Sequence, residues 1–449
     1  MKEISKSSLK KYKSSFYDDK NNQIAQRAVI SNGIYQSTRD YSAVNLDQNQ
    51  WSYEIDAGDI HSQEQSGRCW LYAALVLAET KMAKNLKVAN LKLSKSYLYF
   101  YDKLEMANSF YQNIIDTRDK DLHSKDVQHI LRVKQYDGGY WHEAANLIEK
   151  YGVVPESAMT ETQDTKNSGS LNSILNEKLS IDAQKLRDSK KPEELKEQLL
   201  TEIYKILAIS YGQPPEDFTF DYLPQEDKDK KDDDKKSKDS KKDSNKKNLK
   251  TIKSTPLEFW QKYGVEISDF VSLNFMLDYK KSKWNTHYEE NDVDSMYGKK
   301  YRFATIQISD SVKKSIVKQL KNNEPVWFSW DVEKQFSNKL GILDSNIWKY
   351  NELYGLNLSL DKESRGLYRD ISSSLHATAI VGFREENGKI THWKVKNSWG
   401  KDRGQSGYIS MNDNYLEDYV LDATIRKKYL PKAVQEIFDK QPEIITYWK

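Results

Sequence analysis

The residues that could do chemistry begin with the only cysteine in this chain of 449 residues, Cys69. It follows Ser66, Gly67 and Arg68 and precedes an apolar segment, residues 70–78, whose pattern predicts a helix. A helix N-terminus stabilises a thiolate and lowers the pKa of its thiol, and Arg68 adds a nearby positive charge. We therefore predict a nucleophile. The alternative is a buried structural cysteine.

A general base is the second requirement, and the chain offers seven histidines. His376 opens a strand-like run of small apolar residues, residues 375–382, where an imidazole is partly desolvated and fixed. His392 follows a charged turn, and His61 lies on a polar loop. We predict that His376 is the base, although a structural or surface role is the alternative for any one histidine.

An orienting group and an oxyanion donor complete the set. Asn397 lies on the strand after that of His376, and adjacent antiparallel strands place facing side chains within about 5 Å of each other. Its side-chain oxygen can accept the imidazole N–H, and Trp399 can shield that bond from water. Gln63, six residues before Cys69, can donate its amide to an oxyanion beside the Cys69 backbone N–H. Taken alone, Asn397 would be a turn residue and Gln63 a polar loop residue.

The elements that must position these residues divide the chain into five parts. Residues 1–60 are expected to wrap the fold, and residues 61–224 form a helical half that carries the nucleophile. Residues 225–253 form a Lys- and Asp-rich insertion that lacks the apolar residues of a core and is expected to be disordered. Residues 254–430 form a sheet-rich half that carries the histidine and asparagine, and residues 431–449 form a C-terminal arm near the active site. The pattern predicts an α+β fold with a cleft between the halves.

Charge and cysteine content exclude several classes of protein. The chain has 70 basic and 67 acidic residues, and this balance argues against a dedicated nucleic-acid binder. One cysteine cannot form an intrachain disulfide, which fits a reducing cytosol. The charged N-terminus lacks the apolar region of a signal peptide, and no run of about 18 apolar residues predicts a membrane span.

In the order Gln63, Cys69, His376, Asn397, these residues resemble the site of papain-like cysteine peptidases. More narrowly, the chain resembles the bleomycin hydrolase / aminopeptidase C family, in the motifs QSGRCWL at 65–71, DGG at 137–139, LIEKYGVVP at 147–155 and KNSWG at 396–400. The resemblance implies a papain-like fold of two subdomains with family-specific insertions. It also implies a cytoplasmic peptidase that uses neither metal nor cofactor, and a homohexamer whose active sites face an inner chamber.

In that family a C-terminal arm lies in the cleft, and its terminal carboxylate pairs with the α-amino group of the substrate. Here the chain ends at Trp448 and Lys449, short of the length that is typical of the family. We therefore expect Lys449 to lie near the substrate and endopeptidase or oligopeptidase action to be favoured. A strict aminopeptidase, a non-catalytic nucleic-acid-binding hexamer and a thiol-dependent acyl transferase are the alternatives.

Overall fold

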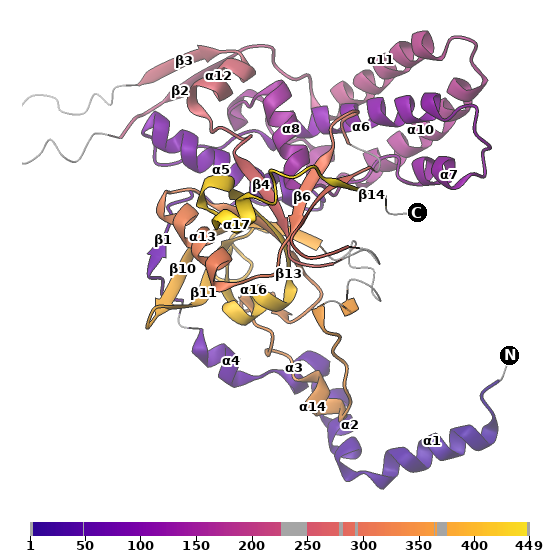
Figure 1. Ribbon diagram of the computed structural model, residues 1–449, viewed down its shortest axis with the longest axis vertical. Coiled ribbons are helices and arrows are strands. Elements are labelled where there is room, and N and C mark those ends of the chain that lie inside the picture. Colours follow the sequence, from indigo (N-terminus) through magenta and orange to yellow (C-terminus); the bar gives the residue numbers. More distant parts are fainter. Residues whose placement is uncertain are drawn as a thin grey trace, which may run out of the picture.

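Helix α5 (Cys69–Leu86) joins the two halves of the molecule (Figure 1). Residues 70–80 of this helix are all buried, as is typical of a helix at the centre of a fold. Most of its apolar side chains belong to the core of the helical half, whereas Val76 belongs to the core of the sheet. Packing on both sides therefore fixes the direction in which Cys69 points.

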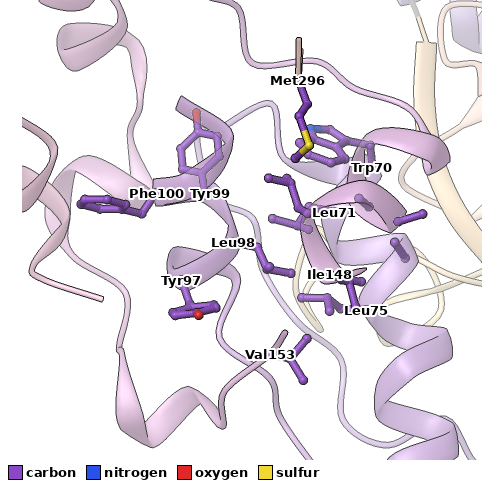
Figure 2. Packing of buried hydrophobic residues seen from close by; sticks show 14 of the residues in the cluster. Trp70, Leu71, Leu75, Tyr97, Leu98, Tyr99, Phe100, Ile148, Val153 and Met296 are labelled. Atoms are coloured by element: carbon purple, nitrogen blue, oxygen red, sulfur yellow. The ribbon is translucent and has the colours of Figure 1, made fainter. Parts of the chain in front are cut away.

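The computed structural model describes residues 3–47, 49–225, 249–277, 282–291, 295–362, 364–365 and 375–446. In the helical half, side chains of α5 pack against the aromatic helix α6, whose N-terminus is capped by the Ser94 hydroxyl (Figure 2). The surrounding helices are α6 (Lys95–Asp116), α7 (Lys125–Arg132), α8 (Trp141–Tyr151), α9 (Gln163–Lys166), α10 (Gly169–Asp188), α11 (Pro192–Tyr211) and α12 (Pro256–Tyr263).

The boundary of the helical half lies further along the chain than residue 254. Phe259 and Trp260 of α12 are buried in the same core as α5 and α8. The helical half therefore includes α12, and the sheet-rich half begins after it.

The described strands of the second half form one large sheet of 12 strands. Its order is β14-β5-β6-β4-β13-β7-β10-β11-β12-β9-β8, with β1 paired to β10. Most neighbours are antiparallel, and β4–β6, β9–β12 and β5–β14 are parallel. The strands are β1 (Tyr53–Glu54), β4 (Phe270–Asn274), β5 (Thr286–Glu290), β6 (Tyr301–Thr305), β7 (Val326–Asp331), β8 (Phe336–Ser337), β9 (Ile342–Leu343), β10 (Leu375–Glu386), β11 (Lys389–Lys396), β12 (Tyr408–Asn412), β13 (Val420–Arg426) and β14 (Glu443–Ile445).

The predicted α+β fold is confirmed. The predicted strand of His376 is β10, which pairs with the following strand β11, and β11 ends just before Asn397 and pairs in turn with β12. The helices of this half lie beside the sheet or follow it in the chain. They are α13 (Asp310–Lys321), α14 (Tyr350–Tyr354), α16 (Asp413–Tyr419) and α17 (Lys432–Gln435). No helix in the described ranges is both long and apolar enough to cross a membrane.

The charged insertion connects two strands that pair with each other. β2 (Phe218–Tyr222) and β3 (Lys250–Ser254) form an antiparallel pair, and residues 226–248 between them lie outside the described residues. The prediction that residues 225–253 are disordered was wrong for residues 250–253, which belong to β3. Ile252 lies opposite Phe220, and both side chains pack against the helical core, which orders β3.

The N-terminal segment does not wrap the fold along its whole length. α1 (Lys6–Asp18) and α2 (Lys20–Asn32) contain no buried residue, and α1 projects away from the rest of the molecule (Figure 1). Contact with the sheet-rich half begins at α2, which lies against α14. It continues through α3 (Ile34–Thr38) and α4 (Tyr41–Leu46), and between these two helices the Asp40 N–H donates to the Ile347 carbonyl at 2.9 Å. The expected wrapping therefore does not include α1.

The described part of the C-terminal arm ends on the edge of the sheet. β14 pairs with β5, and Ile445 packs against Tyr288, Tyr301 and Phe303. Residues 447–449, which include Trp448 and Lys449, lie outside the described residues. The position expected for Lys449 therefore stays a prediction.

Candidate active site

Cys69 is the first residue of α5, so its backbone N–H has no acceptor within the helix. The thiol is half-buried and faces the backbone N–H groups of Ala377, Trp70 and Cys69 itself. Because Ala377 follows His376 directly, the beginning of β10 lies beside the thiol.

Burial raises the pKa of the Cys69 thiol, and the three backbone N–H groups act against this rise. The sequence led us to expect a lowered pKa from the helix N-terminus. The structure corrects this, because desolvation of the thiolate outweighs the stabilisation by backbone N–H groups.

The charge of Arg68 is compensated by a residue that the sequence analysis missed. Arg68 is fully buried, and its guanidinium donates to both carboxylate oxygens of Glu161, at 3.1 and 2.8 Å. It also donates to the Ser66 hydroxyl at 2.8 Å. The arginine therefore fixes the turn before Cys69, and its expected role as an additional positive charge is wrong. Nothing in the local sequence points to Glu161, which lies more than 90 residues away in the chain.

His376 and Asn397 are brought together as predicted. The His376 Nε2 lies 2.8 Å from the Asn397 Oδ1, so the asparagine accepts the Nε2 proton and leaves Nδ1 free of this bond. The His376 ring stacks on Trp399 at 4.4 Å between centroids and meets the edge of Trp330 at 5.4 Å. Burial lowers the pKa of His376 to about 4, and the bond to Asn397 acts in the opposite direction.

The Gln63 amide is held at both ends. Its Nε2 donates to the Ser66 carbonyl at 2.6 Å, and its Oε1 accepts from the Ser398 hydroxyl at 2.6 Å. A primary amide has two N–H groups, so one remains after the bond to Ser66. Ser398 lies in the KNSWG motif, but the sequence alone did not indicate that its hydroxyl orients Gln63.

Backbone bonds join the Gln63 segment to the Asn397 segment. The Gln63 N–H donates to the Ser398 carbonyl at 2.8 Å, and the Gly400 N–H donates to the His61 carbonyl at 3.0 Å. The structure thus places Gln63 beside the turn that carries Asn397 and Trp399, although more than 330 residues separate them in the chain.

A cavity of about 390 Å³ lies next to Cys69. Its described lining residues come from α5, the loop before α8, β7 and β10: Cys69, Val133, Tyr136, Gly138, Gly139, Tyr140, Trp327, Ser329, Leu375 and Ala377. A side chain on Gly139 would come within 2.6 Å of the Trp70 indole, so glycine is needed for this close approach. The volume lies in the range of ligand pockets.

Asp137, the first residue of the DGG motif, holds one wall of this cavity. Its carboxylate accepts from the Gly67 N–H at 3.2 Å and the Tyr99 hydroxyl at 2.5 Å. Burial raises the pKa of Asp137, but Lys103 and several hydrogen bonds outweigh it and lower the pKa to about 2. Asp137 therefore connects the segment before Cys69 with the glycine wall.

The other histidines considered from the sequence have structural partners. The buried His61 pairs with Glu79 at 2.9 Å, and Lys95 donates to the same carboxylate at 2.6 Å. His392 is buried on β11, not on an outward edge, and contacts the Thr391 hydroxyl at 3.1 Å. Among the described residues, no group of three or more His, Cys, Asp or Glu residues is arranged to hold a metal ion.

The site contains a thiol beside the strand that carries a histidine, an imidazole that is hydrogen-bonded to a carboxamide, and an oriented amide donor. These are the groups needed for acyl transfer through a covalent thioester. Comparisons with known proteins place the whole chain in one family. The model of the peptidase C1-like family matches residues 3–449. Aminopeptidase G of Lactobacillus delbrueckii subsp. lactis is 34% identical over 453 residues, which cover 99% of this chain and 98% of that protein.

Two further relatives span the same length. Aminopeptidase C of Listeria monocytogenes is 31% identical over 452 residues, which cover 99% of this chain and 98% of that protein. The crystal structure of PepW from Lactobacillus rhamnosis HN001 superimposes with a TM-score of 0.89 at 32% identity, over 99% of this chain and 98% of that one. Both halves are therefore shared with these relatives.

Proposed function

Because this chain belongs to the peptidase C1-like family and is a papain-like cysteine peptidase of the aminopeptidase C (bleomycin hydrolase) type, we propose that Cys69, His376 and Asn397 act as its catalytic triad. The substrates are oligopeptides. The observation that carries this proposal is the buried bond between His376 and Asn397 at 2.8 Å, at the strand end that lies beside the Cys69 thiol.

The proposed reaction begins with proton transfer from Cys69 to His376. Burial opposes the charged form of each group alone, but a transfer between them keeps the pair neutral overall. The thiolate attacks the scissile carbonyl carbon, and the developing oxyanion accepts from the Gln63 amide and the Cys69 N–H. His376 then protonates the leaving amine, which leaves a thioester on Cys69.

In the hydrolysis of the thioester, water takes the place of the leaving amine, and His376 acts first as the base. The neutral His376 takes a proton from a water molecule, whose oxygen attacks the thioester carbonyl. The second tetrahedral intermediate collapses, the carboxylic acid leaves, and the thiol is restored. Asn397 keeps the ring in the productive tautomer and orientation throughout, while Trp399 and Trp330 exclude water from their bond.

The triad is tested by single substitutions and fluorogenic peptides. We expect Cys69→Ala and His376→Ala to abolish turnover and Asn397→Ala to leave residual activity, because its role is orientation. His392→Ala is the matched control, since it removes another buried histidine of the same sheet. A thiol-alkylating reagent should inactivate the wild type. Full activity of Cys69→Ala would refute the proposal.

The site supports two kinds of peptidase. The printed names of the relatives, aminopeptidases G and C, support release of N-terminal residues as the first candidate. Endopeptidase or oligopeptidase action is the second candidate, and the cavity of about 390 Å³ beside Cys69 would seat a side chain of such a substrate. Paired substrates with free and blocked N-termini separate the two. Hydrolysis of free-amine peptides alone supports the first, and comparable cleavage of blocked peptides supports the second.

We further propose that the protein is cytoplasmic and assembles as a homohexamer. The exposed apolar side chains of α1 and α2, including Leu9, Ile24 and Ile30, support association between copies. A nucleic-acid-binding hexamer is a weaker alternative, because the formal net charge is only +3. Salt-dependent oligonucleotide binding by Cys69→Ala would support that alternative as a second activity.

A further inference from the structure

A buried hydroxyl without a partner lies in the wall of the cavity. Ser329 is 3% exposed, and its Oγ has no hydrogen-bond partner. Its backbone N–H donates to the Asp422 carboxylate at 3.2 Å, so the main chain at this position is held in place. A buried polar atom that lacks a partner costs free energy, which makes this hydroxyl a group that a ligand can satisfy.

The pairing of β7 with β10 directs Ser329 toward the catalytic cysteine. Ser329 lies opposite Ala377, and both residues line the cavity. Side chains of directly opposite residues lie on the same face of a sheet. Because the Ala377 N–H faces the Cys69 thiol, Ser329 and Cys69 lie on neighbouring parts of the wall of one cavity.

The rest of the wall is apolar or has its polar atoms engaged. The Trp327 indole N–H donates to the Trp70 carbonyl at 3.0 Å, and the Tyr136 hydroxyl donates to Glu143 at 3.1 Å. None of the described lining residues carries a charged side chain. A charged substrate side chain would therefore lose its hydration without gaining an opposite charge.

We propose that this cavity binds an uncharged substrate side chain with an apolar body and a hydroxyl at its far end, and that Ser329 selects tyrosine over phenylalanine. This inference rests on the proposed peptidase function. The aromatic walls and the volume of about 390 Å³ suit a large ring. A serine hydroxyl can both donate and accept, so it pairs with a phenol in either direction. A phenylalanine ring in the same place leaves the Ser329 Oγ unpaired.

The test compares kcat/KM for fluorogenic dipeptide amides that differ only by tyrosine or phenylalanine. In one pair of peptides, tyrosine or phenylalanine is the residue whose carbonyl belongs to the scissile bond. In a second pair, the exchange is made one residue closer to the N-terminus. Each peptide is tested with a free and with a blocked N-terminus. For the position seated in the cavity, we expect the wild type to prefer tyrosine by roughly 3- to 10-fold. Ser329→Ala should reduce that ratio to about 1, chiefly by slowing cleavage of the tyrosine peptide.

Ser410→Ala is the matched control. Ser410 is also buried in the sheet with an unpartnered Oγ, but it does not line the cavity, so its removal should leave the ratio unchanged. Ser329→Cys keeps the size of the side chain and weakens its hydrogen bonding, and it should give an intermediate ratio if Ser329→Ala does not fold.

The outcomes separate the two hypotheses. If hydrolysis depends on the thiol but the ratio of kcat/KM for the tyrosine and phenylalanine peptides is the same in wild type and Ser329→Ala, this inference alone is overturned. That result would mean that water satisfies the Ser329 hydroxyl. Absence of hydrolysis of every peptide by the wild type overturns the proposed function and this inference with it. Loss of the preference in Ser329→Ala but not in Ser410→Ala supports both.

Discussion

At the scale of single residues, two hydrogen bonds fix the orientation of the Gln63 amide, which is the oxyanion donor of the proposed mechanism. The Gln63 Oε1 accepts from Ser398 and its Nε2 donates to the Ser66 carbonyl, so the amide cannot rotate without breaking both bonds. Under the proposed mechanism, Ser398 is a positioning residue that acts through Gln63. In the same mechanism its neighbour Asn397, which is bonded to His376, positions the imidazole.

We expect Ser398→Ala to lower kcat by roughly 10-fold with little change in KM, because an oxyanion donor acts mainly in the transition state. Gln63→Ala should lower kcat further, by about 10²- to 10³-fold. Steady-state kinetics on one peptide measure both effects, and Ser410→Ala again serves as the control for a buried serine. Wild-type kcat in Ser398→Ala would mean that the Ser66 carbonyl alone holds the amide.

At this scale the sequence predicted residue types but not partners. Chemistry and chain order predicted Gln63, Cys69, His376 and Asn397 as site residues, and their catalytic roles stay predictions. The partners that hold them could not be found locally. Glu161, which pairs with Arg68, lies 93 residues further along the chain, and the raised pKa of the Cys69 thiol depends on burial, which only the packed fold defines.

At the scale of elements, the first turn of α8 contains a carboxyl group whose pKa is far from its ordinary value. Glu143 is buried and accepts from the Tyr140 N–H at 2.6 Å and the Tyr136 hydroxyl at 3.1 Å. Burial, together with the nearby Asp102, raises the pKa of Glu143 from 4.5 to about 7. Tyr136 and Tyr140 both line the cavity, so this group supports the wall that faces Cys69.

The raised pKa predicts how stability changes with pH. Between pH 4.5 and 7 the folded protein keeps a proton on Glu143 that the unfolded chain has released, so the free energy of unfolding falls as pH rises through this range. The loss attributable to Glu143 is at most about 3 kcal/mol. Glu143→Gln keeps the shape and cannot ionise, so we expect a smaller loss of stability between pH 5 and pH 8.

Chemical denaturation at several pH values measures this difference. Burial also raises the pKa of Asp102, to about 6, so part of the decrease should remain in Glu143→Gln. Glu258→Gln is a suitable control, because Glu258 caps the exposed N-terminus of α12. Identical pH profiles for wild type and Glu143→Gln would contradict the prediction.

The elements themselves were largely predictable where a local signal was strong. The predicted helix after Cys69 and the predicted strand that His376 opens agree with α5 and β10. β3 was missed because its charged sequence resembles the insertion that precedes it, and only its pairing with β2 orders it.

At the scale of the whole molecule, the cavity lies where the two halves meet. The Trp327 indole of the sheet donates to the Trp70 carbonyl of α5 at 3.0 Å, and both residues lie in one core. Cys69 thus comes from one half and the strand of His376 from the other. The sequence predicted this division, but it could not predict that α1 projects outward or that α2 buries no residue, because an amphipathic helix does not specify whether its partner lies in the same chain.

The exposed arm leads to a prediction about assembly. α1 and α2 bury no residue, yet they expose Leu9, Tyr12, Ile24 and Ile30 by more than half. Removal of residues 1–32 should therefore leave the thermal midpoint within a few degrees of wild type, since no core contact is lost. If the arm packs against other copies, its removal should also reduce the hexamer to smaller species.

Light scattering coupled to size-exclusion chromatography measures the mass of both proteins at matched concentrations. Leu9→Lys combined with Ile30→Lys is a milder variant, which keeps the arm but makes its apolar surface unfavourable to bury. Exchange of the exposed Gln26 to Lys adds charge to the same arm at a polar position and serves as its control. A truncated protein with the mass of the full chain would show that assembly, if any, uses the sheet-rich half. A wild type of single-chain mass would refute the hexamer itself.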